Sequence, residues 1–79
     1  MTVLLFAAAR DLAGAHAVEV PVETGATVGE VRAALAEAYP TLAALLPRCR
    51  VAVGRAFAGD EDVVPAGAEV ALIPPVSGG

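Results

Sequence analysis

One amphipathic helix with a complete start signal constrains the fold of this chain more than any other feature. Thr27 and Glu30 have the spacing of a capping box, in which the threonine caps the helix and the glutamate reaches back to the cap. The apolar residues that follow share one helical face: Val28, Val31, Leu35 and Ala38. Gly29 costs about 1 kcal/mol inside a helix, so we expect another segment to approach it closely. Pro40 ends the helix. A chain of 79 residues can form only one modest core, so the apolar face of this helix has to pack against one face of any sheet that the chain forms.

Short apolar runs on both sides of the helix predict five strands. We expect them at residues 1–8, 17–22, 50–53, 56–58 and 70–73. Residues 10–15 contain Gly14 and are expected to form the loop or turn of a hairpin between the first two strands. Pro21 confines the second strand to a sheet edge or a strand end, because it cannot donate to a ladder. Residues 42–46 are expected to form a short turn that plugs one end of the core.

The order of these elements predicts an α+β fold with a mixed sheet. A hairpin, a crossover helix, two short strands and a returning last strand place the first and last strands side by side at the sheet centre. The main helix packs on one face of this sheet. This arrangement is the β-grasp, or ubiquitin-like, fold, and we expect residues 1–75 to form it as one domain. Residues 76–79 are expected to be an extended, flexible C-terminal tail.

The two central strands are apolar on both faces, although a single helix covers only one face. The residues that alternation assigns to the core are Val3, Leu5, Val70 and Leu72. The residues between them form an apolar patch on the open face: Leu4, Phe6, Ala71 and Ile73. Exposed apolar patches mark interfaces, so we expect this patch to contact a partner. The alternatives are that loops cover this face or that the two faces are exchanged.

The last strand leads into a chain end that is suited to project from the body. Pro74 and Pro75 stop the strand, because proline has no N–H to donate and its φ is fixed. The chain ends in Gly78 and Gly79, which lack side chains that would block a narrow slot. Fully extended, residues 76–79 reach about 13–14 Å beyond the body. We favour delivery of the Gly79 α-carboxylate into the active site of a partner, and the alternative is an ordinary disordered end.

Composition excludes several classes of function. The net charge is −4 and the five basic residues are all arginines, so no nucleic-acid partner is expected. Cys49 is the only cysteine, which excludes an internal disulfide, a four-thiolate zinc site and an iron–sulfur cluster. No uncharged run approaches the roughly 18–20 residues of a membrane span. The run Val3–Ala9 lacks the charged flank of a signal peptide, so we expect a cytoplasmic protein without a membrane partner.

Other side chains that carry chemistry have no suitable neighbours in the sequence. Cys49 has no His–acid constellation that would support a redox or thioester role. His16 has no second ligand at metal-binding spacing. Asp60–Asp62 is an acidic run, for which a solvated loop is a more ordinary interpretation than a cation site. None of these residues is expected to be catalytic.

The terminal segment resembles a known family. Residues 69–79, Glu-Val-Ala-Leu-Ile-Pro-Pro-Val-Ser-Gly-Gly, are similar to the C-terminus of molybdopterin synthase small subunits, the ubiquitin-like sulfur carriers of molybdenum-cofactor biosynthesis. The likeness extends to further segments: Val3–Ala7 with Arg10, Ala26–Glu30 and Arg50–Val53. Two positions depart from the family pattern. Gly54-Arg55 stands where members often carry Asn-Gly, and Ile73 stands where they often carry an aromatic residue.

The resemblance implies a non-catalytic sulfur-donor subunit of a sulfurtransferase. A ubiquitin-activating-like adenylyltransferase uses ATP to adenylate the carboxylate of Gly79, which then becomes a C-terminal thiocarboxylate. The tail residues that enter the large synthase subunit are Pro75, Val76, Ser77 and Gly78. The resemblance further implies a heterotetramer of two small and two large subunits, in which sulfur passes to cyclic pyranopterin monophosphate and forms the molybdopterin dithiolene. It implies no bound cofactor and no metal.

Three other functions remain open from the sequence. The adenylated Gly79 can be joined to lysines of target proteins, as in a ubiquitin-like protein modifier. A sulfur carrier of the thiamine pathway has the same fold and the same Gly-Gly end, although the Pro-Pro-Val-Ser spacer argues against it. The third alternative is a plain binding module with an incidental tail. The product formed on Gly79 separates the modifier from the sulfur carrier.

Overall fold

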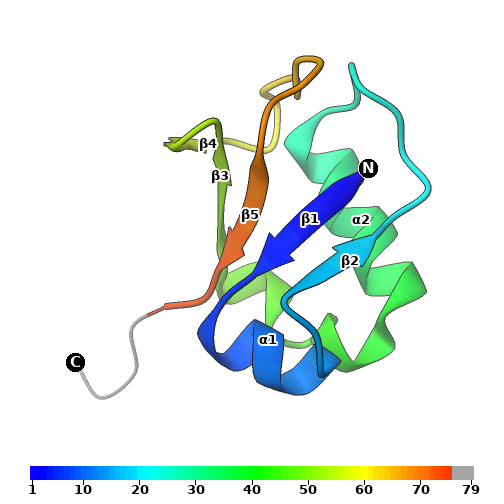
Figure 1. Cartoon of the computed structure of the whole chain (residues 1–79), viewed down its shortest axis with the longest axis vertical. Coiled ribbons are helices and arrows are strands. Elements are labelled where there is room, and N and C mark those ends of the chain that lie inside the picture. Colours follow the sequence, from blue (N-terminus) through cyan, green and yellow to red (C-terminus); the bar gives the residue numbers. More distant parts are fainter. Residues whose placement is uncertain (76–79) are drawn as a thin grey trace.

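The computed structural model describes residues 1–75 of the chain (Figure 1). In chain order its elements are β1 (Thr2–Leu5), α1 (Ala7–Ala13), β2 (Ala17–Glu19), α2 (Val28–Ala38), the 3₁₀ turns η1 (Pro40–Leu42) and η2 (Leu46–Arg48), β3 (Arg50–Val53), β4 (Ala56–Ala58) and β5 (Val70–Ile73). The predicted tail, 76–79, lies outside the described residues.

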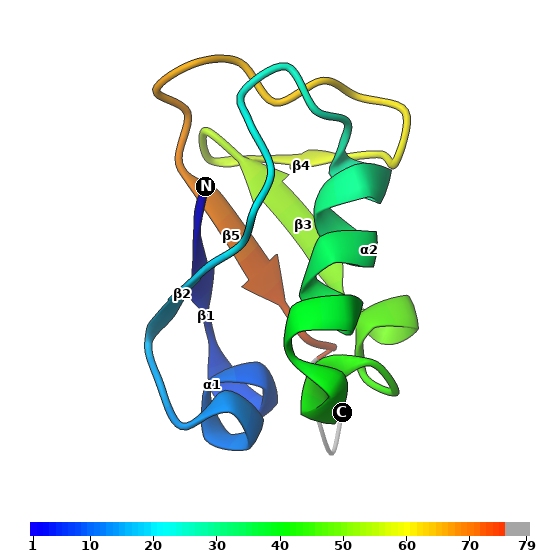
Figure 2. The same cartoon turned by 90° about the vertical axis from the view of Figure 1, so that its right-hand side faces the viewer.

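Within these residues the strands form one five-stranded sheet in the order β2-β1-β5-β3-β4 (Figure 1). The central strands β1 and β5 are parallel, and Leu4 lies opposite Ala71. The other neighbouring strands are antiparallel. α2 packs on one face, and none of the described elements covers the opposite face (Figure 2). This is the mixed β-grasp sheet that the element order predicts.

The core lies between α2 and the covered face of the sheet. The residues that form it are Val3, Leu5, Ala9, Val18, Val20, Val28, Val31, Leu35, Leu42, Leu46, Cys49, Val51, Val64, Val70 and Leu72. The four strand residues assigned to the core from alternation are all in this cluster, so the predicted orientation of β1 and β5 is confirmed. Ala38, placed on the apolar helix face by its spacing, is exposed at the end of α2.

The start of α2 has the predicted cap. The Glu30 amide donates to Thr27 Oγ1 at 3.2 Å, and the Thr27 amide donates to Glu30 Oε1 at 2.9 Å. The expected close approach at Gly29 is also present, because its amide donates to the carbonyl of Asp60 at 2.9 Å. A Cβ at Gly29 would lie 3.3 Å from that same oxygen. The cap and the glycine therefore fix the helix start against the 59–63 loop.

Loss of the cap should have a measurable effect on stability. We expect Thr27→Ala to lower the free energy of unfolding by about 0.5–2 kcal/mol, because the Glu30 amide loses its acceptor. Urea denaturation measures this change. The control is Thr41→Ala, since the Thr41 side chain is exposed and makes no hydrogen bond within residues 1–75. Equal stability of the two variants would contradict the assigned role of the cap.

The structure corrects the prediction for the segment after the first strand. β1 ends at Leu5, and the residues expected to continue the strand and then form a loop are the helix α1. The segment Ala7–Ala13 contains four alanines, and alanine is the strongest helix former. Gly14 ends α1 in the left-handed conformation, with φ of 71°, and its amide donates to the Arg10 carbonyl at 2.9 Å. α1 buries Ala9 completely against the core.

Arg32 ties α2 to two later segments. Its Nε donates to Asp60 Oδ1 at 2.8 Å, and Nη1 and Nη2 donate to the carbonyls of Leu46 and Cys49, both at 2.7 Å. These contacts hold the start of β3 next to the helix.

No helix within residues 1–75 has the length and apolar character that crossing a membrane requires.

Candidate functional site

The open face of the sheet carries a row of apolar side chains. Strand register places Leu4 of β1, Ala71 of β5 and Ala52 of β3 next to one another, and Ala52 lies opposite Phe57 of β4. Since residues paired across a ladder project to the same side, all of them face away from α2. The row crosses the sheet from β1, through β5 and β3, to the edge strand β4.

A hollow of about 250 Å³ opens in this row, and we call it the sheet pocket. Its lining residues are Phe6, Ala52, Arg55, Phe57, Glu69, Ala71 and Ile73. The small side chains of Ala52 and Ala71 form the floor, with Ala71 only 7% exposed. Phe6 and Phe57 stand around them and are 46% and 57% exposed. A small floor between large exposed aromatic rings is a shape that accepts an apolar side chain from a partner.

Three of the four residues of the predicted patch line the sheet pocket, and the interface role predicted for the patch stays a prediction. Phe6, Ala71 and Ile73 meet in the sheet pocket, whereas Leu4 lines a different, wider hollow. Ala71 is buried, so the patch is concave there. Sequence reasoning missed Phe57. The two-residue turn between β3 and β4 sets a register that pairs Phe57 with Ala52, and that register is the signal that points to it.

The backbone that presents Phe6 is unusual. Phe6 lies after β1 and caps α1, and its carbonyl accepts from the amides of Ala9 and Arg10 at 3.1 and 3.4 Å. Ala7 follows with φ of 51°, a left-handed conformation that a residue with a Cβ seldom adopts. Phe6 itself keeps extended backbone angles, φ of −128° and ψ of 155°, so strand alternation places its side chain on the open face with Leu4. The chain turns into α1 only at Ala7.

Two arginines flank the sheet pocket. Arg50 lies with its guanidinium carbon 4.2 Å from the centroid of the Phe57 ring, a cation–π contact. Arg55 is in the turn between β3 and β4, where Gly54 and Arg55 have φ of 57° and 75°. This is the primed hairpin turn that Asn-Gly favours, so the departure from the family pattern leaves the turn geometry intact. A residue other than glycine at the second position costs about 1–2 kcal/mol.

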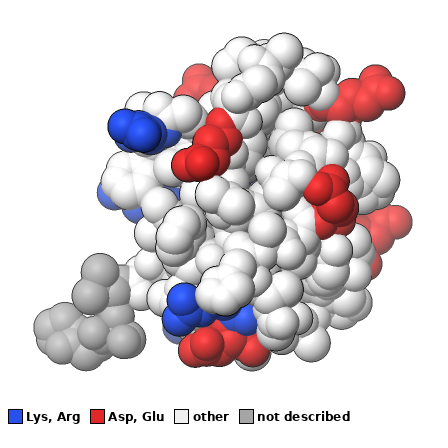
Figure 3. Space-filling model, in the orientation of Figure 1, with Lys and Arg blue, Asp and Glu red and all other residues white. Residues whose placement is uncertain are grey.

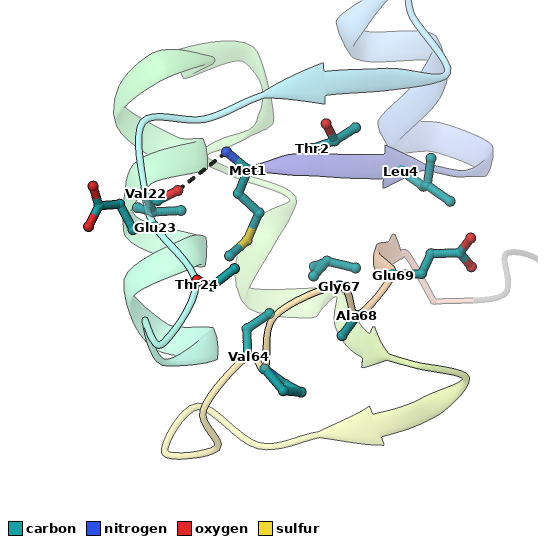
Figure 4. A pocket seen from close by; sticks show the side chains of 12 residues that line it. Met1, Thr2, Leu4, Val22, Glu23, Thr24, Val64, Gly67, Ala68 and Glu69 are labelled. Carbon is teal, nitrogen blue, oxygen red and sulfur yellow. Dashed lines mark hydrogen bonds between the residues drawn. The ribbon is translucent and has the colours of Figure 1, made fainter.

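A second, wider hollow of about 760 Å³ lies at the other end of the sheet (Figure 4). Met1 and Val22 are on one side of it, and Val64 and Glu69 are on the other. The Met1 amino group donates to the carbonyls of Val20 and Val22 at 2.8 and 3.3 Å, so this charged group already has hydrogen-bond partners. Despite its larger volume, this hollow does not bring together a group of side chains with evident chemistry.

The chain leaves the sheet next to the sheet pocket. Ile73, the last residue of β5, pairs with Arg50, and Pro74 is buried while Pro75 is exposed. A tail that starts here therefore begins at the edge of the apolar face. The other predicted tail residues, Val76, Ser77, Gly78 and Gly79, lie outside the described residues. The roles predicted for them stay predictions.

The remaining candidates do not form a site in the described part of the chain. Cys49 is buried, and its thiol donates to the Leu45 carbonyl at 3.4 Å. Burial raises the pKa of the Cys49 thiol, and the nearby Arg32 lowers it by a smaller amount, so the surroundings disfavour the thiolate. Residues 1–75 contain no group of three or more His, Cys, Asp or Glu side chains that could hold a metal ion.

Comparison with known proteins gives matches over nearly the whole chain. The model of the ThiS family matches residues 3–79. The molybdopterin synthase sulfur carrier subunit of Chlamydomonas reinhardtii is 33% identical over 79 residues, which cover 98% of this chain and 95% of that protein.

Solved structures give the same picture. The crystal structure of SAMP1 from Haloferax volcanii is 36% identical, covers 100% of this chain and 98% of its own, and has a TM-score of 0.84. A crystal structure of small archaeal modifier protein 1, also from H. volcanii, is 34% identical, with coverage of 96% and 97% and a TM-score of 0.81. The fold and the family resemblance predicted from the sequence are thereby confirmed.

Proposed function

Because this chain belongs to the ThiS family, we propose that it is a sulfur carrier that holds sulfur as a thiocarboxylate on Gly79. The observation that carries the proposal is the position of β5. This strand is held at the centre of the sheet by β1 and β3, and it leads into Pro74 and Pro75 next to the sheet pocket. A partner that binds the open face therefore has the start of the tail within its contact surface.

The proposed chemistry begins with a poor acyl donor. A carboxylate resists substitution because its anionic oxygen cannot leave. Adenylation joins a carboxylate oxygen of Gly79 to the α-phosphorus of ATP and releases pyrophosphate. A hydrosulfide ion from the sulfur source then attacks the carbonyl carbon and displaces AMP, and loss of its proton leaves the thiocarboxylate. The acid–base and electrostatic groups for both steps belong to the partners, and this chain contributes delivery and positioning.

The pathway we propose is molybdopterin synthesis. The relative from C. reinhardtii, which matches over almost the full length of both chains, is named as a sulfur carrier subunit of molybdopterin synthase. In that role the chain is the small, non-catalytic subunit. Each dithiolene contains two sulfur atoms, so its synthesis needs two carriers that each bring one sulfur as a thiocarboxylate. The proposed partners are a large synthase subunit, in a heterotetramer, and a ubiquitin-activating-like adenylyltransferase. We place this chemistry in the cytoplasm, where thiols stay reduced.

Intact mass spectrometry tests the sulfur-carrier proposal. The purified chain is incubated with ATP, the adenylyltransferase and a sulfur source. We expect a mass increase equal to the exchange of one oxygen for one sulfur, located on Gly79 by fragmentation. The controls omit ATP or the sulfur source, and neither should give the product. Adenylation without any sulfur-containing product would contradict the proposal.

A second candidate function follows from the similarity to small archaeal modifier protein 1, whose name describes a modifier. In this case Gly79 is joined to an amine of a target protein by an isopeptide bond. The chain has no lysine, so it cannot form lysine-linked chains of its own copies. Fragment spectra of cell lysates distinguish the two products, since a modifier leaves a branched C-terminal peptide on target lysines. The thiamine-pathway alternative is distinguished from molybdopterin synthesis by measuring which acceptor takes the sulfur from the thiocarboxylate.

A further inference from the structure

We propose that Arg50 and Arg55 make the sheet pocket selective for a partner segment that carries a carboxylate next to an apolar side chain. The partner is the large subunit that accepts the sulfur, so this inference rests on the proposed function. The apolar side chain enters the pocket, and the carboxylate pairs with the guanidinium groups at its rim. The two arginines thereby determine which protein the carrier docks to.

The first observation is that both guanidinium groups are available. Arg32 uses its donors on Asp60 and on two backbone carbonyls. Within residues 1–75, Arg50 and Arg55 form no ion pair and no side-chain hydrogen bond, and the Arg50 guanidinium lies over the Phe57 ring. Both are exposed. A guanidinium held over an aromatic ring keeps its planar donors free for a bidentate carboxylate.

The second observation is the distribution of charge. The chain has a net charge of −4, yet two of its five basic residues are at this one pocket. On the open face, basic atoms appear on the side that contains β3 and β4 and again near α1, and acidic atoms are spread over the rest of the face (Figure 3). With Arg50 and Arg55 against one acidic residue, Glu69, the surroundings of the sheet pocket carry more positive than negative charge, which favours an acidic partner group.

The third observation is backbone strain at the same place. Among the described residues, only Ala7 and Arg55 have positive φ without being glycine, and each adjoins or lines the sheet pocket. Glycine would relieve the strain at Arg55, since its side chain is exposed and contributes no contact to the core. A strained conformation kept at the rim of a pocket indicates a use for the side chain that it presents.

Glu69 allows a test of whether the partner group at the sheet pocket is negatively or positively charged. It lines the same pocket with the opposite charge, and it forms no ion pair with Arg55 within the described residues. A carboxylate from the partner is attracted by Arg55 and repelled by Glu69. A basic partner group would reverse both effects. Neutral variants of the two residues therefore report the charge that the partner brings.

The experiment measures binding of the full chain to the large synthase subunit by calorimetry at low and high salt. We expect Arg55→Gln and Arg50→Gln each to weaken binding about three- to tenfold at low salt, because rim charge pairs add affinity that salt screens. Glu69→Gln should strengthen binding about twofold. The matched control is Arg48→Gln, which removes an exposed arginine that lines no part of the sheet pocket.

Arg55→Gly gives a second, independent readout. It should raise the urea midpoint of the free protein, because it relieves strain, and still weaken binding to the large subunit as Arg55→Gln does. A merely structural arginine would not combine higher stability with lower affinity. Wild-type affinity in the Arg50 and Arg55 variants would overturn this proposal and leave the sulfur-carrier function standing.

Three further outcomes would overturn the inference. Tighter binding by Arg55→Gln and weaker binding by Glu69→Gln would indicate a basic partner group. Self-association of the carrier alone in sedimentation, lost in Arg55→Gln, would assign the pocket to a second copy of this chain. If the wild-type chain does not bind the large subunit at all, the docking inference and the proposed synthase role fail together. Thiocarboxylate formation, measured separately, shows whether sulfur carriage itself survives.

Discussion

A chain that ends one residue beyond Gly79, or one residue before it, is expected to lose sulfur transfer completely. The reactive carbon has to sit at a fixed distance from the docked body, and one residue moves it by about 3.3–3.6 Å. A displacement of even about 1 Å can reduce the rate roughly 100-fold when positioning provides the catalysis. Pro74 and Pro75 at the exit of β5 restrict the backbone conformations that might absorb the change.

Stability and docking separate this effect from misfolding. We expect the free energy of unfolding to stay within about 0.5 kcal/mol of the wild-type value, because the altered residue lies outside the packed core. Binding to the large subunit should survive in part, since the open face supplies most of the contact. Sulfur transfer is measured by single turnover, and trimming of the extended chain back to Gly79 should restore it. An untrimmed, extended carrier that still forms the dithiolene would contradict the sulfur-carrier function.

The second large effect is expected at Phe6. Phe6→Asp should weaken binding to the large subunit by more than about 2 kcal/mol, because it replaces an aromatic wall of the sheet pocket with a hydrated charge. The fold should remain intact, since this side chain is 46% exposed and is not part of the core cluster. Calorimetric titration measures the affinity, and urea denaturation measures the stability.

A matched control exists on α1. Leu12 is 50% exposed and lines no part of the sheet pocket, so Leu12→Asp adds the same charge to an equally exposed apolar position. We expect it to bind with nearly wild-type affinity. Phe6→Ala should change affinity in the same direction as Phe6→Asp, without the added charge. Equal binding by Phe6→Asp and Leu12→Asp would exclude the sheet pocket from the docking surface.

Much of the fold could be predicted because its signals are local. The capping box at Thr27 and Glu30 depends on residues three positions apart, and hydrogen bonds confirm it. The division of β1 and β5 into a covered and an open face follows from the two-residue period of a strand. The adjacency of these strands follows from short connections and the crossover helix. The family, too, was visible in the terminal segment.

Local patterns were less informative where two kinds of structure compete for the same residues. Ala7 and Ala8 follow an apolar run, and the strand predicted at residues 1–8 includes them, although alanine favours a helix. The outcome depended on Gly14, which ends α1 in a conformation that only glycine adopts freely, and on the burial of Ala9.

By itself, then, the sequence determined the β-grasp element order, the two faces of the central strands and the family. Only the tertiary structure decided that the open face is hollow, that Phe57 and Arg55 border the hollow, and that Arg32 joins α2 to Asp60 and to the start of β3. These residues are brought together from segments that lie far apart in the chain. The period of apolar residues in the sequence indicates to which face a side chain points. The residues that this side chain contacts depend on strand register and on how the loops fold over the core.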